Sequence, residues 1–232
     1  QWCLENNPNL IEKMTMSPLQ IHQFFAICLL FNEEFANSLG LNHDEDEWPW
    51  EEIARCGLIK YDKDGKFHFN HLTNAEHFIA GFIFHLLKTI KKLTSVNLDF
   101  IFQVFSDEKF RITRIFLESK FNRVEKVQDL KGFNSSKEIC EKVKNDKNFL
   151  QLCVSEGLFN IFEFFALTLK KSDVKLFKDV IEHKHKRYKA TNLMFILPHA
   201  TNLAKFENFL DEILNFNSEN IFDDFLLKVD KG

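Results

Sequence analysis

The sequence predicts an all-α protein with one short β-hairpin. The 232 residues include only 7 Gly and 4 Pro but 28 Phe. Few chain breakers and many large apolar side chains are typical of long helices that pack on one another. Apolar residues recur at helical spacing through most of the chain, whereas they alternate with polar residues only near residues 58–69.

The first predicted helix runs over residues 17–39. Ser17 and Pro18 suit its start, because serine caps helices and proline is tolerated in their first turn. Gly40 is expected to end it. The acidic segment 43–50 then predicts a loop that leads into a short helix over residues 50–56.

The predicted hairpin lies between two short apolar runs in residues 58–69. Asp64-Gly65 separates the runs, and glycine tolerates the positive φ that such a turn requires. A helix over residues 73–92 follows. Thr73 and Glu76 have the spacing of a capping box at its start.

From residue 97 onward the pattern predicts pairs of helices that repeat. Residues 148–165 contain two short apolar helices around Gly157, and a second copy begins 44 residues later, at Asn192. A weaker copy covers residues 98–117 and precedes both. Helix-turn-helix units that bury their faces against one another form a solenoid.

Composition argues against several classes of function. The formal net charge is −4, which disfavours nucleic acid as a partner. The 5 cysteines include no CxxC pair, so we expect free thiols rather than a disulfide scaffold. No apolar run reaches the roughly 18 residues that span a bilayer, so membrane insertion is not expected.

The candidate metal and catalytic patterns are weak. The acidic segments 43–47 and 62–65 lack the ligand spacing of a calcium loop, and we interpret them as a solvated loop and a hairpin turn. His68, His71 and His77 have donor atoms for zinc, but the first two do not share a helix face. No local pattern activates a cysteine. We therefore predict no catalytic residue, no metal and no cofactor, and a protein that is not an enzyme.

Residues 56–80 carry a family resemblance through His71, Thr73, Glu76, Phe78 and Ala80. With the preceding hairpin, they resemble the end of the winged-helix region of NACHT-type STAND NTPases, although Asn74 and His77 depart from its usual aromatics. Residues 17–21 are similar to the proline motif that ends the family's nucleotide-binding region. The chain has no GxxxxGK[ST] loop to hold a triphosphate, so the resemblance implies a part that lacks the NTPase core.

Residues 148–165 resemble an ankyrin repeat, with Gly157 at the glycine between its two helices. The spacing of 44 residues exceeds the usual 33 and calls for longer helices or an inserted turn. Together the two resemblances imply the C-terminal part of a NACHT-ankyrin protein of the kind abundant in insects. They imply a winged-helix-like module over residues 1–95 and degenerate ankyrin-like repeats over residues 96–232.

The predicted function is non-enzymatic protein binding through the helical-repeat surface, in a regulatory or immune-related context. The partner is expected to be a protein, such as an immune receptor or a signalling protein, in the cytoplasm. Because the chain begins at Gln1, an alternative is a secreted effector that lost a leader and meets another organism's immune system. The predicted binding residues form the one dense basic run in the chain: His183, Lys184, His185, Lys186, Arg187, Tyr188 and Lys189.

Overall fold

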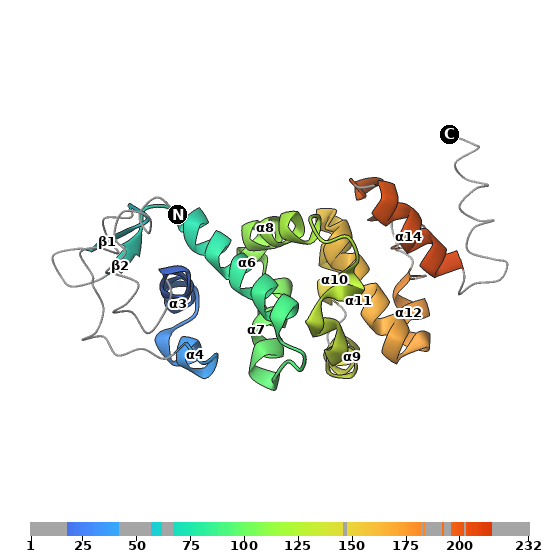
Figure 1. Ribbon diagram of the computed structural model, residues 1–232, viewed down its shortest axis with the longest axis horizontal. Coiled ribbons are helices and arrows are strands. Elements are labelled where there is room, and N and C mark those ends of the chain that lie inside the picture. Colours follow the sequence, from blue (N-terminus) through green and yellow to red (C-terminus); the bar gives the residue numbers. More distant parts are fainter. Residues whose placement is uncertain are drawn as a thin grey trace. The chain divides into compact units, whose positions relative to one another are not determined.

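The structure is a computed structural model, and its described part is helical apart from one antiparallel hairpin, as predicted (Figure 1). The chain divides into two compact units, residues 1–83 and 84–232, and the boundary between them falls within helix α6 (Leu72–Thr89). The predicted division falls after this helix, between residues 95 and 96. The structure describes residues 18–41, 57–61, 67–145, 148–181, 183, 192, 196–201 and 203–214.

The single helix predicted over residues 17–39 is wrong, because two helices occupy this range. They are α3 (Pro18–Leu30) and α4 (Glu33–Ser38). Asn32 separates them: its backbone is extended, and its Oδ1 accepts a hydrogen bond of 2.7 Å from the amide of Phe35. Asparagine favours such a cap over a place inside a helix, so the second helix starts here.

The hairpin has the predicted position. Strand β1 (Ile59–Tyr61) pairs with β2 (Phe67–Phe69), and Ile59 lies opposite Phe69. Ile59 is buried, which gives the hairpin one face toward the core of the smaller unit. The predicted turn at residues 62–65 lies outside the described residues. The likeness of this unit to a winged helix stays a prediction.

The capping box lies one helix later than predicted. Helix α6 begins at Leu72, so Thr73 belongs to its first turn instead of preceding it. A capping box does start α7 (Ser95–Ser106), where the amide of Asn97 donates to Thr94 Oγ1 over 3.2 Å. In return, the amide of Thr94 donates to Asn97 Oδ1 over 3.1 Å.

Corresponding helices of successive repeats pack on each other in the larger unit. The first pair is α7 and α8 (Arg111–Phe121), joined through the 3-10 turn η2 (Glu108–Phe110). The second pair is α10 (Asn148–Glu156) and α11 (Phe159–Ser172), around Gly157 as predicted. Helix α7 packs on α10 and α8 packs on α11. These contacts are what a helical repeat predicts.

A third helix follows each pair, which the sequence pattern did not indicate. Two 3-10 turns, η3 (Val127–Asp129) and η4 (Lys131–Ser135), lead into α9 (Ser136–Asn145) after the first pair. Helix α12 (Val174–Ile181) follows the second pair. The added helix α12 accounts for a spacing longer than that of a two-helix ankyrin repeat.

Phenylalanine rings fill the core between the first two repeats. Phe149 and Phe165 lie 4.8 Å apart between ring centroids, and Phe102 and Phe105 meet the same pair edge to face or tilted. The third repeat, with η5 (Leu197–His199) and α14 (Leu203–Leu214), joins the stack through Phe209. Edge-to-face rings add about 0.5–1.5 kcal/mol per pair beyond the area they bury.

Candidate functional site

The base of the predicted binding loop is fixed by hydrogen bonds. The carbonyl oxygen of His183 accepts a bond of 3.0 Å from the amide of Asn192. The side chain of Asn192 donates to the carbonyl oxygen of Val180, at the end of α12, over 2.8 Å. The two ends of the segment between residues 183 and 192 are therefore held side by side against α12.

His183 is the one predicted binding residue that the structure describes. Its side chain is exposed, and its Nε2 lies 3.3 Å from Nε2 of Gln151 on α10. The loop base thus borders the second repeat as well as α12. The other six predicted residues, from Lys184 to Lys189, lie outside the described residues.

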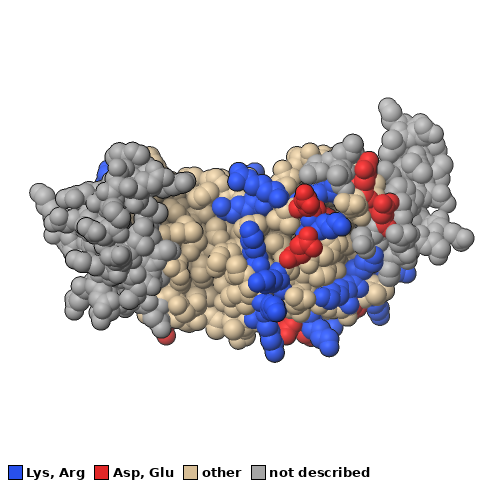
Figure 2. Space-filling view, in the orientation of Figure 1, with Lys and Arg blue, Asp and Glu red and all other residues tan. Residues whose placement is uncertain are grey.

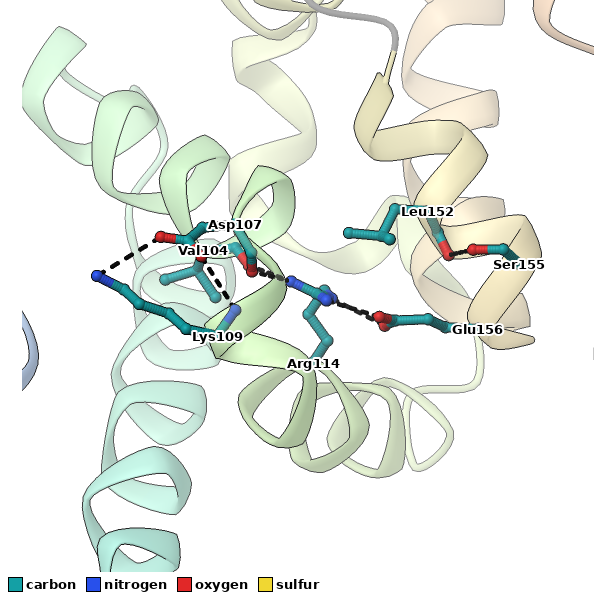
Figure 3. A network of polar contacts seen from close by, with 7 residues as sticks. All are labelled: Val104, Asp107, Lys109, Arg114, Leu152, Ser155 and Glu156. Atoms are coloured by element: carbon teal, nitrogen blue, oxygen red, sulfur yellow. Dashed lines mark hydrogen bonds and ion pairs between the residues drawn. The ribbon is translucent and has the colours of Figure 1, made fainter.

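Arg114 on α8 is fully buried and joins three helices (Figure 3). Its guanidinium forms a bidentate pair with Glu156 at the end of α10, with distances of 2.6 and 2.8 Å. Its Nη1 donates to the carbonyl oxygens of Val104 and Asp107, which lie on and just after α7. Every contact of the group is internal, so we assign Arg114 a structural role: it ties the first repeat to the second.

Glu118 caps α11 from the neighbouring helix α8. Its Oε1 accepts from the amide and the side chain of Asn160, and its Oε2 accepts from the amide of Ile161. Leu158, at the capping position of α11, offers no side-chain acceptor, so the carboxylate satisfies amides that the helix leaves unpaired. Burial raises the pKa of Glu118, and these hydrogen bonds oppose the shift.

Lys205 on α14 brings the third repeat into the same network. Its Nζ donates to the carbonyl oxygen of Phe121, over 2.6 Å, and to Oδ1 of Asn160, over 2.9 Å. Burial lowers the pKa of Lys205, while Glu163 and Glu118 act in the opposite direction. Lys205 is 2% exposed, which leaves its ammonium group no access to a substrate.

Glu163 on α11 is the most strongly perturbed carboxyl group of this network. Burial raises its pKa to about 7, against the opposing charge of Lys205. Its Oε2 is buried without a hydrogen-bond partner in the described part of the chain. A pKa near neutrality suits a general acid or base, but a side chain that is 4% exposed cannot reach a substrate.

The described cysteines are free thiols, as predicted for this composition. Cys140 and Cys153 are buried, and burial raises the pKa of both thiols. The protonated form that results is the unreactive one, because nucleophilic attack requires the thiolate. Cys28 is half-buried, and Cys3 and Cys56 lie outside the described residues.

The described histidines do not form a metal site. His68 on β2, His71 before α6 and His77 on α6 are all exposed. Across the described ranges, no group of three His, Cys, Asp or Glu residues could hold a metal ion. The acidic segment 43–47 lies outside those ranges. Within them, no helix combines the length and the apolar character needed to cross a membrane.

Comparisons with protein-family models, curated proteins and solved structures find no match for this chain. The resemblances to NACHT-type NTPases and to ankyrin repeats therefore stay predictions that depend on the residues quoted for them.

Proposed function

We propose that the chain is a non-enzymatic protein-binding module that uses the surface of its helical repeats. The observation that carries this proposal is the fixed base of the basic loop. Asn192 bonds both His183 and Val180, so the segment between residues 183 and 192 starts from a rigid base on stacked helices. Binding loops are commonly presented in this way, on a scaffold that does not change.

The chemistry of the buried groups favours binding over catalysis. Arg114 and Glu118 are fully engaged in tying helices together, and Glu163 and Lys205 lie in the same interior. The described thiols that are buried have raised pKa values. The proposed regulatory or immune context has separate support, namely the resemblance of residues 56–80 to NACHT-type proteins.

The proposal is tested with the folded chain as bait in a lysate of its source. We expect one protein to be retained in a stoichiometric amount. That protein is then purified, and its Kd is measured for the wild-type chain and for a loop variant. The loop variant reverses four charges: Lys184→Glu, Lys186→Glu, Arg187→Glu and Lys189→Glu.

A loss of binding in the loop variant supports the proposal and its site. Binding that survives in the loop variant keeps the binding function but removes the loop as its site. Retention of no protein at all contradicts the binding function. Circular dichroism of each variant checks that the helices remain folded.

A further inference from the structure

A basic surface lies on the larger unit, away in sequence from the predicted binding residues 183–189. Its members come from three segments: the end of α6 with the turn after it, the start of η4, and the end of α11. All of them are exposed. We call this surface the basic face, and it consists of Lys88, Lys91, Lys92, Lys131 and Lys171.

Packing of η4 against the end of α6 brings the first two segments together. A Cβ atom at Gly132 would lie 2.9 Å from Cδ2 of Leu87, so the backbone beside Lys131 lies directly on α6. The amide of Leu93 also donates to Oγ of Ser135 over 2.8 Å. Lys131 is therefore held next to the lysines at the end of α6.

The third segment joins through Phe133 of η4. Nζ of Lys171 lies 4.8 Å from the centre of the Phe133 ring and 3.5 Å from its carbonyl oxygen. The lysine at the end of α11 thus covers the same 3-10 turn that contacts α6. Figure 2 shows Lys and Arg side chains in a band over the middle of the described surface, with some Asp and Glu side chains among them.

The lysines of the basic face have no salt-bridge partner among the described residues. Other lysines of the same unit do: Lys109 pairs with Asp107, Lys142 with Asp99, and Lys144 with Glu141 and Asp173. The whole chain carries a net charge of −4, so this surface has the opposite sign to its protein. Concentrated positive charge without salt-bridge partners attracts an anion.

We infer that the basic face binds an acidic segment of a partner protein. The inference rests on the proposed function and adds the chemical class of the partner. Single-stranded nucleic acid is less favoured, because the large apolar side chains exposed on the described surface include no Phe, Tyr or Trp. One imidazole ring, that of His85 on α6, is exposed near Lys88. The basic face also contains no Arg, the residue that pairs phosphates in a bidentate way.

The test measures binding of a fluorescein-labelled oligoglutamate peptide to the full chain by fluorescence anisotropy. The face variant is Lys88→Gln, Lys91→Gln and Lys131→Gln. The control variant, Lys60→Gln, Lys109→Gln and Arg111→Gln, loses the same charge at other exposed positions. Lys91 precedes the start of α7, whereas Lys109 and Arg111 follow its end. The 12 residues of this helix separate its two ends by about 18 Å.

We expect the face variant to weaken the Kd for the peptide about tenfold, which corresponds to about 1.4 kcal/mol, and the control variant to change it less than about twofold. Equal weakening in both variants would show general charge attraction and overturn the inference. So would an unchanged Kd in the face variant. An oligouridylate, or vesicles with anionic lipid, that bind more tightly than the peptide through the same lysines would also overturn it.

The same variants separate this inference from the proposed function. If the partner from the lysate binds the face variant as well as the wild-type chain, the inference fails while the proposed function stands. If no protein partner exists, the proposed function fails, whatever the peptide shows. Loss of that partner in the face variant alone supports both.

Discussion

Glu163 and Lys205 approach each other between α11 and α14, yet the carboxyl group keeps one oxygen without a hydrogen-bond partner among the described residues. Its pKa of about 7 lies above the usual 4.5 because burial disfavours the charged form. The folded chain therefore holds this proton more tightly than the unfolded chain. The stabilisation is fully present below about pH 4.5 and is lost as the pH rises through about 7.

Replacement of this carboxyl group tests the sign of the effect. We expect Glu163→Gln to raise the free energy of unfolding at pH 8 by about 1–3 kcal/mol, because the variant keeps a neutral side chain at every pH. Near pH 4.5 the difference from the wild-type chain should be much smaller. Urea unfolding at both pH values, followed by circular dichroism, measures it.

Glu207→Gln on α14 is the matched control for Glu163→Gln, because Glu207 is exposed on the same stack of helices. Its effect on the free energy of unfolding should be small at both pH values. If Glu163→Gln changed stability equally at pH 4.5 and pH 8, titration of Glu163 would not explain its effect.

Individual residues were the least predictable level of this protein. The basic run at residues 183–189 stands out in the sequence, because consecutive charges are visible without a fold. Arg114 and Glu156 do not stand out, since only the stacking of α8 on the next repeat brings them together. Lys131 and Lys171 were missed for the same reason, although the Lys91-Lys92 doublet at the end of a predicted helix was a partial signal.

Among the connections between helices, the turn from α10 to α11 is the most constrained. Gly157 has φ of +70°, a conformation in which a Cβ atom is strained. A Cβ atom here would also lie 2.5 Å from Nδ1 of His199. We expect Gly157→Ala to lower the free energy of unfolding by about 1–3 kcal/mol, as measured by urea unfolding.

Two further variants separate the steric part of this loss of stability from the backbone part. Gly157→Ala combined with His199→Ala removes the steric clash and should recover part of the loss relative to His199→Ala alone. Gly40→Ala reports the backbone part in the smaller unit, because Gly40 has φ of +79° and its Cβ would meet nothing within 4 Å. No recovery in the double variant would contradict a role for His199.

Helix boundaries were predictable where local chemistry decides them. The hairpin and the helix pair around Gly157 were recognised from spacing and turn residues. The break at Asn32 was missed, because apolar residues at helical spacing continue across it. Helix α12 was also missed, because the sequence pattern was interpreted as helix pairs and this short helix falls between two such pairs.

At the scale of the larger unit, α11 occupies the centre of the stack. It packs on α8, α9, α10 and α12, and its residues from Phe159 to Leu169 are all buried. We expect Phe165→Ala to cost about 3–5 kcal/mol of stability, since Phe165 contacts rings of both α7 and α10. Hydrogen exchange followed by mass spectrometry should show protection falling in α7, α10 and α11 together.

Phe209→Ala is the comparison at the edge of the described stack. Phe209 is as buried as Phe165 but contacts only Phe159 and Phe162 of the preceding repeat among the ring pairs described. In a chain of repeats, its loss should raise exchange mainly in α14. Identical exchange patterns for the two variants would instead show that the larger unit opens as a single cooperative block.

For the described residues of the whole chain, the predicted order of elements was correct: a hairpin comes early, and repeated helices come later. Periodicity makes such an order visible, because each repeat uses the same spacing of apolar residues. The period of 44 was interpreted as longer helices or an inserted turn. The structure has neither of these as the main addition: the short helix α12 follows the second pair of helices.

The buried thiol of Cys153 can report how often the interior of the larger unit opens. The Cys153 side chain on α10 is buried, and burial raises the pKa of its thiol, so the thiol stays protonated. An alkylating reagent can reach and attack it only when the packing around α10 opens. The rate at which the peptide that contains Cys153 gains the mass of the reagent then reports how often the stack of helices opens. A bound partner that stabilises the closed stack of helices would slow the alkylation of Cys153.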